Sequence, residues 1–155
     1  MAQANEGMNV MAVTDHQADT LRALLAGDFG EHARLRAQLD RDADREGYSA
    51  LITAGFFLAA DRRFAQSHTR SDITGFVASA RATSADAAGQ IDPLIAERLI
   101  RGVFEDEDMH DVPGQRLTET QVMLLTALVS EAWLTGPELD AFVADSRKLA
   151  DRWTS

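Results

Sequence analysis

TRSDITGFVASAR, residues 69–81, recurs without a gap as TGPELDAFVADSR at residues 135–147. In each copy a threonine, Thr69 or Thr135, stands three residues ahead of an acid. This spacing is typical of a capping box, in which the threonine and the acid each accept a free backbone N–H at a helix start. The apolar residues that follow keep helical spacing. The repeat therefore indicates architecture and carries no chemistry, because its matched positions are caps and core contacts.

Each copy follows an almost continuous apolar segment. Residues 50–60 contain no charged side chain, and residues 122–129 are apolar apart from Thr126. Helices that are apolar around nearly their whole circumference lie at the centre of a bundle. We therefore expect two copies of a helical hairpin, each a buried helix followed by a Thr-capped amphipathic one, packed about a pseudo-twofold axis.

Helix boundaries are marked along the rest of the chain. Thr14 and Thr118 begin further capping boxes, and Asp92 precedes a proline at the first helical position. Gly27 is placed to end the first helix. No segment shows the two-residue alternation that is typical of a half-buried strand.

The region between the first helix and residues 50–60 is rich in charge. We expect a surface helix over residues 28–45, with a thin seam of Leu35 and Leu39, ended by Gly47. A separate central helix follows over residues 49–64. Because a thin apolar seam can pair across a twofold axis, a homodimer is one prediction.

The predicted fold is all-α: a single-domain bundle of about six to seven helices with an internal duplicated helical hairpin. The helical domain spans residues 14–155. Residues 1–13 carry Glu6 and small polar residues, with no charged segment leading into an apolar one. We interpret them as a disordered leader rather than a signal peptide.

Composition narrows the classes of partner. The chain has 155 residues, 45% of them hydrophobic, a formal charge of -10 and a pI near 4.7. This charge repels nucleic-acid phosphates and anionic lipid, so we expect no nucleic acid and no membrane as partner and favour a basic protein. The apolar residues 50–60 are also too few to cross a bilayer, which takes about 20. Without cysteine the chain suits a reducing compartment, and we expect a cytoplasmic location.

The densest charge run is EDEDMHD at residues 105–111. It lacks the glycine and the alternating ligands of an EF-hand loop, and Glu107 with His110 falls short of the two such pairs that a di-iron bundle requires. We therefore predict no metal site and no cofactor. The run is expected to be a solvated loop that contacts a basic partner through Glu105, Asp106, Glu107, Asp108 and Asp111.

Three further groups of residues are candidate sites. Arg62, Arg63 and Arg70 could grip an anion near a Thr-capped helix start. The repeated Arg81 and Arg147 are interpreted as structural, each bonding exposed carbonyls or pairing with an acid. Side chains of the central helices could line a small-ligand pocket, namely Phe56, Phe57, Met123 and Trp133. No nucleophile and base stand in a catalytic arrangement, so we predict no catalytic residue.

Short runs give the chain a family likeness between about residues 47 and 153. They are Gly47-Tyr48, Phe56-Phe57, Arg62-Arg63-Phe64, Asp72-Ile73, Phe76-Val77, Ala96-Glu97-Arg98-Leu99-Ile100 and Leu149-Ala150-Asp151-Arg152-Trp153. In these the chain resembles small, all-helical, uncharacterised proteins of high-GC bacteria. The resemblance implies an all-α fold and brings no activity, cofactor or catalytic residue with it.

Three functions stay open on the sequence alone. The first is a cytoplasmic, non-enzymatic interaction or regulatory protein whose acidic surface binds a basic protein partner. The second is a helical bundle, and in one version an enzyme, that binds a small ligand or a metal. The third is a helix-turn-helix DNA binder with residues 71–81 as the recognition helix, which the acidic charge opposes.

Overall fold

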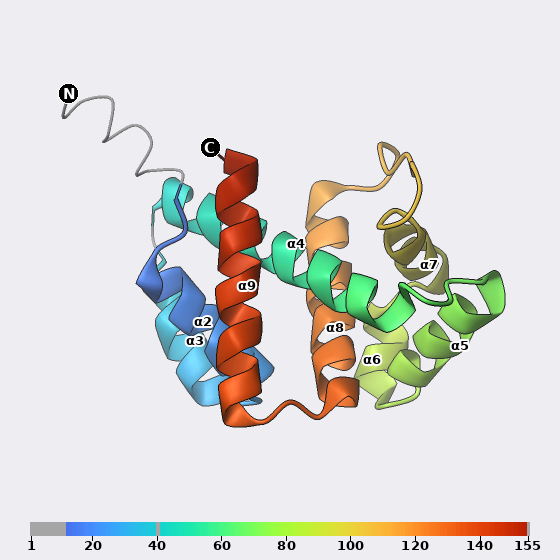
Figure 1. Cartoon of the computed structure of the whole chain (residues 1–155), viewed down its shortest axis with the longest axis horizontal. Coiled ribbons are helices and arrows are strands. Elements are labelled where there is room, and N and C mark those ends of the chain that lie inside the picture. Colours follow the sequence, from blue (N-terminus) through green and yellow to red (C-terminus); the bar gives the residue numbers. More distant parts are fainter. Residues whose placement is uncertain (1–11, 40, 155) are drawn as a thin grey trace. The chain divides into compact units, whose positions relative to one another are not determined.

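The structure, a computed structural model, describes residues 12–39 and 41–154, and this part of the chain is helical without strands (Figure 1). Its helices are α2 Asp15–Leu25, α3 Phe29–Ala37, α4 Asp42–Phe64, α5 Arg70–Arg81, α6 Ala85–Gln90, α7 Pro93–Arg101, α8 Gly114–Ala132 and α9 Gly136–Thr154. The predicted all-α class is confirmed. Eight helices in the described residues exceed the predicted six to seven by the short α6, whose six residues carry no amphipathic pattern.

The chain divides into two compact units. The first consists of the residues up to Gly55 and those from Trp133 onward, and the second is Phe56–Ala132. Helix α4 begins in the first unit and ends in the second. Helices α2, α3 and α9 belong to the first unit, and α5 to α8 belong to the second. The prediction of one domain over residues 14–155 stays a prediction.

Both apolar segments are helical, as predicted. Residues 50–60 lie within α4, where Phe57 is the one exposed side chain of the segment. Residues 122–129 lie within α8, and none of them is exposed. Among the helices of the described residues, none combines the length and the apolar composition that crossing a bilayer demands.

In the first unit, α2 packs against α3 and α9. The predicted capping box begins α2, because the Thr14 side chain accepts the N–H of Gln17 at 3.2 Å and the Gln17 side chain accepts the N–H of Thr14 at 2.9 Å. Gly27, with a φ of +80°, turns the chain after the helix, as predicted. The apolar face of α2 is buried through Leu21 and Leu24.

Polar contacts fasten α9 to the segment that precedes α2. The backbone N–H of Val13 donates to the Asp151 carboxylate at 2.9 Å. The Arg147 guanidinium donates to the Val13 carbonyl at 2.8 Å and to Asp15 at 2.7 Å. Val13 is therefore buried and hydrogen-bonded in the first unit, although the sequence predicts it to lie in a disordered leader. The rest of the predicted leader, residues 1–11, lies outside the described residues.

The predicted boundary at Gly47 is wrong. Helix α3 ends at Ala37, and α4 starts at Asp42 and passes through Gly47 without a break. A Cβ on Gly47 would lie 2.4 Å from Nε2 of Gln17, so the glycine admits a neighbouring side chain and does not end a helix.

This correction also removes the surface on which the predicted homodimer rested. Residues 28–45 form no continuous helix. The seam residues Leu35 and Leu39 are both buried within the first unit, at 9% and 3% exposed. These two side chains therefore leave no apolar stripe for a second copy to cover, and the homodimer itself stays a prediction.

In the second unit, α5 packs against α6, α7 and α8. Its buried face carries Ile73, Phe76 and Val77. The ring of Phe76 meets that of Phe64, at the end of α4, edge to face with centroids 5.6 Å apart, a favourable aromatic geometry. Asp92 caps α7 by accepting two N–H groups, as the Asp-Pro pair predicts.

The predicted helix start at Thr118 is wrong by one turn. Helix α8 begins at Gly114, because Leu117 already donates to the Pro113 carbonyl at 3.0 Å. The Thr118 hydroxyl donates to the carbonyl of Gly114 at 3.1 Å, a bond that threonine makes inside a helix. Ser/Thr-x-x-Glu/Gln spacing therefore occurs here without a capping box.

Candidate functional site

The acidic run forms a loop between α7 and α8, as predicted, and Arg98 of α7 fixes it in place. The two terminal nitrogens of Arg98 donate to the two carboxylate oxygens of Asp111, at 2.9 and 3.2 Å. Arg98 also donates to the carbonyl of Asp108. Glu107 lies 3.5 Å from Nε of Arg98 and 3.7 Å from Arg101. We call residues 105–111 the acidic loop.

We call the contacts of Arg98 with Asp108 and Asp111 the clamp. In it, Arg98 and Asp111 each stabilise the charged form of the other. The hydrogen bond from Arg98 holds the pKa of Asp111 below its usual range, and the same bond raises the pKa of Arg98. Both shifts arise because two parallel N–H groups of the guanidinium donate to the two oxygens of one carboxylate. Asp111 is mostly exposed, so the clamp fixes geometry more than it adds stability.

The side chains of the remaining acids of the loop face solvent. Glu105, Asp106 and Asp108 are exposed. The Asp108 carboxylate accepts the N–H of His110 at 2.9 Å within the loop. The carboxylates of Glu105 and Asp106 have no hydrogen-bond or ion-pair partner among the residues that the structure describes. Two of the five predicted contact residues, Glu107 and Asp111, are thus taken by arginines, and the others remain available.

Of the three arginines of the predicted anion site, Arg62, Arg63 and Arg70, Arg63 is already committed to other partners. Arg63 pairs with Glu131 of α8, and its guanidinium lies 4.8 Å from the centroid of the Phe64 ring. The start of α5 is occupied as well. There Thr69 accepts the N–H of Asp72, and the Ser67 hydroxyl donates to the Asp72 carboxylate.

That carboxylate belongs to the chain itself. Hydrogen bonds from the side chains of Ser67 and Thr69 lower the pKa of Asp72. An ionised carboxylate therefore already lies where an external anion would bind, since negative charge is stabilised at a helix N-terminus. The anion site stays a prediction, and the helix start that it would use already holds the carboxylate of Asp72.

The four residues of the predicted ligand pocket lie in very different surroundings. Phe56 is 3% exposed, Met123 is half-buried, Phe57 is 37% exposed and Trp133 is 87% exposed. A side chain as exposed as that of Trp133 lines no enclosed cavity. Trp133 follows the end of α8 with a φ of +53°, a strained conformation for a bulky side chain.

The histidines make separate contacts. His68 stacks on Phe104 at 4.3 Å, and His16 lies 3.0 Å from the carbonyl of Leu35. Glu107 and His110 both lie in the acidic loop, where Glu107 is committed to arginine. Within residues 12–39 and 41–154, no three His, Asp or Glu side chains form a group that could hold a metal ion.

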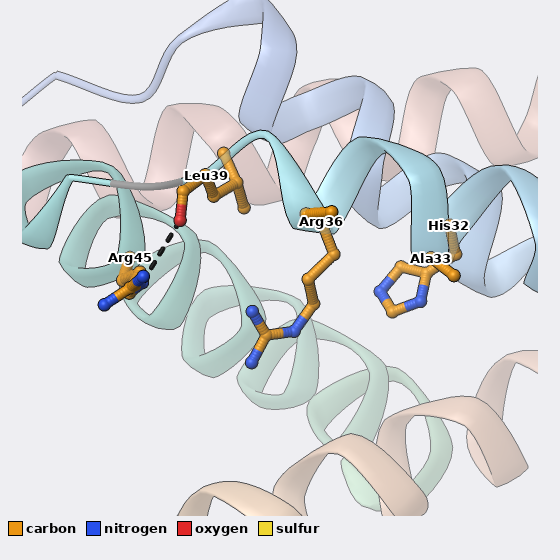
Figure 2. A pocket seen from close by; sticks show the side chains of 6 residues that line it. His32, Ala33, Arg36, Leu39 and Arg45 are labelled. Atoms are coloured by element: carbon orange, nitrogen blue, oxygen red, sulfur yellow. Dashed lines mark hydrogen bonds between the residues drawn. The ribbon is translucent and has the colours of Figure 1, made fainter.

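A cationic cavity in the first unit was not predicted. It lies between α3 and the start of α4 and has a volume of about 510 Å³. Figure 2 shows Arg36 extending from α3 toward α4, with His32 on the same helix and Arg45 on α4. The lining residues are His32, Ala33, Arg36, Ala37, Leu39 and Arg45.

Two hydrogen bonds order the wall of this cavity. Nε of Arg45 donates to the Leu39 carbonyl at 3.1 Å, the bond drawn in Figure 2. Nε2 of His32 lies 3.0 Å from the hydroxyl of Tyr48, a side chain that is 5% exposed. Burial raises the pKa of Tyr48 to about 12, against the opposing charge of Arg36. Burial and the same arginine lower the pKa of His32.

The sequence held a partial signal for this cavity. His32 and Arg36 are four residues apart and therefore share one face of a helix. The misplaced boundary at Gly47 hid the turn that brings Arg45 opposite them. Comparison of the chain with models of protein families, with curated proteins and with solved structures finds no match.

Proposed function

We propose that the chain is a non-enzymatic interaction protein whose acidic loop binds a basic protein partner. The clamp of Arg98 on the loop is the observation that carries the proposal. It holds the backbone at Asp108 and the carboxylate of Asp111, while Glu105 and Asp106 stay exposed. A loop that is ordered before binding loses less conformational entropy when a partner arrives.

The charge of the whole chain supports the same kind of partner. A formal charge of -10 attracts cations over a distance of about one Debye length, roughly 8 Å at physiological salt. Such a field raises the rate at which a basic partner meets the loop, and salt weakens it. Arginine-rich segments suit the exposed carboxylates best, because the guanidinium fork matches a carboxylate geometrically.

The experiment compares binding of a fluorescein-labelled arginine-rich peptide to two variants with the same total charge. Glu105→Gln with Asp106→Asn removes the exposed pair of the acidic loop. Asp61→Asn with Asp86→Asn removes two exposed acids elsewhere in the second unit. We expect the loop variant to lose at least about tenfold in affinity by fluorescence anisotropy, two charge-assisted contacts being lost, and the control to lose much less. Equal losses would reject the loop as the binding surface.

We further propose that α5 and α9 are duplicated copies. Ile73 matches Leu139, and these two residues are buried together with the matched pairs Phe76–Phe142 and Val77–Val143, whereas the matched Ala78 and Ala144 are exposed. Both helices begin at a capping threonine, and at Thr135 the box is complete, with Glu138 accepting the N–H of Thr135 at 2.8 Å. The shared cap at the start and the shared buried positions support a common origin of the two helices.

The repeated arginines strengthen this comparison. Arg81 donates to the carbonyls of Ile91 and Ala88, at 2.9 and 3.0 Å, and so closes the end of α6. Arg147 donates to the carbonyl of Val13. Both copies of the arginine therefore bind backbone of a neighbouring segment, as the structural interpretation predicts.

A cytoplasmic location is part of the proposal, because a chain without cysteine suits a reducing compartment.

A further inference from the structure

The cavity between α3 and α4 is lined by cationic and apolar side chains. No carboxylate is among its lining residues, all of which belong to the described part of the chain. A second cavity of about 330 Å³ in the same unit has mixed charges, with Asp19, Asp28 and Glu31 beside Arg22 and Arg34. In a chain of charge -10, this cavity differs from the second in having two arginines and no acid among the lining residues that the structure describes.

Arg36 is the most available of these cations. Its guanidinium has no hydrogen-bond or ion-pair partner among the described residues. Arg34, two residues away on the same helix, is bound by both oxygens of Glu31, at 2.8 and 2.7 Å. Arg36 extends across the cavity toward α4 in Figure 2. An anion in the cavity would supply the partner that Arg36 lacks.

His32 can contribute a donor. The hydrogen bond to Tyr48 occupies Nε2 and fixes the ring. When the Tyr48 hydroxyl donates, the neutral ring carries its proton on Nδ1, which then becomes a donor. Nδ1 has no hydrogen-bond partner within the described residues. An oxyanion accepts from such an N–H group and from guanidinium groups alike.

The size and lining of the cavity indicate what the anion is attached to. A volume of about 510 Å³ lies in the range of small-molecule sites, from roughly 300 to 1,000 Å³. Ala33, Ala37 and Leu39 supply apolar surface beside the charges. The guanidinium of Arg36 suits the phosphate group of a phosphate monoester, which arginine binds through paired N–H groups. We propose that this cavity binds the phosphate group of a small organic molecule, with Arg36 and His32 as its contacts.

This site is separate from the acidic loop, which lies in the other unit, so either proposal can fail alone. The probes are phenyl phosphate, inorganic phosphate and phenol, added to the full chain at constant ionic strength. Binding is followed by NMR through the Hε1 resonance of His32 and by calorimetry. We expect saturable binding of phenyl phosphate, weaker binding of inorganic phosphate and none of phenol.

Matched variants on α3 locate the binding. Arg36→Gln is expected to lower the affinity for phenyl phosphate at least about tenfold, since it removes a charge-assisted pair. Arg34→Gln makes the same change of charge on the same helix at a side chain already paired with Glu31, and is expected to lower it less than threefold. The bound dianion is also expected to raise the pKa of His32, because it stabilises the imidazolium.

Each result decides the proposal. Tighter binding of phenyl phosphate than of inorganic phosphate supports an organic phosphate as the occupant. Equal affinity for the two supports the phosphate site and assigns it to the free ion. Failure of both phosphates to saturate, or equal loss of affinity in Arg36→Gln and Arg34→Gln, would overturn the proposal. So would saturable phosphate binding that leaves the His32 pKa unchanged.

Discussion

Substitution of Gly47 by alanine tests how α4 is packed in the first unit. In an exposed helix interior this change stabilises a protein by about 1 kcal/mol, because glycine loses more backbone entropy on folding. Here the new Cβ would lie 2.4 to 2.9 Å from the terminal atoms of Gln17. Gln17 is 2% exposed and cannot retreat without giving up two hydrogen bonds, from the N–H of Thr14 and to the carbonyl of Asp44 at 2.8 Å.

Losing both bonds of a buried amide costs about 2–4 kcal/mol. After the helix-propensity gain, we expect Gly47→Ala to lower the free energy of unfolding by about 1–3 kcal/mol in urea titrations followed by circular dichroism. Gly75→Ala in α5 is the matched control, since nothing lies within 4 Å of its Cβ, and it should stabilise by about 0.5–1 kcal/mol. In a Gln17→Ala background the Gly47 change should become neutral or stabilising. A Gly47→Ala protein as stable as Gly75→Ala would refute the reasoning.

Further predictions concern arginine contacts, strain and titration. Arg81→Ala and Arg147→Ala should each lower the free energy of unfolding by about 1–2 kcal/mol, measured in urea, because each leaves backbone carbonyls without a donor; unchanged stability would contradict a structural role. Trp133→Gly should raise it by about 0.5–1 kcal/mol, since glycine adopts a positive φ without strain and the indole is almost fully exposed; a loss of stability would show that the indole makes contacts. The pKa of His32 should lie below its ordinary 6.5 in an NMR titration and rise in Arg36→Gln. The imidazole of His32 then binds a proton more tightly in the unfolded chain than in the folded one. As the pH falls through 6.5, this group therefore lowers the free energy of unfolding, by a smaller amount in Arg36→Gln. An ordinary pKa of His32 in both proteins would count against the placement of Arg36.

Local signals in the sequence predicted the fold class and several helix ends. The caps at Thr14 and Thr135 depend on residues within one turn, and both capping boxes form. The apolar segments within α4 and α8 are long enough for their pattern to identify buried helices. These features are local, and the physics that produces them is readable from neighbouring residues.

The predicted helix boundaries are wrong where residues far along the chain determine the structure. Gly47 resembles a helix stop until Gln17, thirty positions earlier, occupies the space beside it. Thr118 carries the spacing of a cap, yet the helix had already started at Gly114. Helix α6 is six residues long, too short to show a period, and depends on the Ser84 cap and on Arg81.

The candidate sites were predicted in part. The acidic loop follows from its composition, whereas the clamp of Arg98 on Asp111 joins residues thirteen positions apart, and no local rule predicts it. The cavity at His32 and Arg36 needs the turn between α3 and α4, which the misplaced boundary removed. Charge along the chain therefore identified one surface, and tertiary contacts determine which of its acids remain exposed.

Chemical-shift mapping with an arginine-rich peptide tests the central proposal most directly. The amide resonances of the ¹⁵N-labelled chain are followed while the peptide is added at physiological salt. If the acidic loop is the binding surface, the largest shifts fall on residues 105–111 and on Arg98, and they shrink in the Glu105→Gln, Asp106→Asn variant. Shifts spread evenly over the acidic surface, or centred away from the loop and unchanged in that variant, would contradict the account.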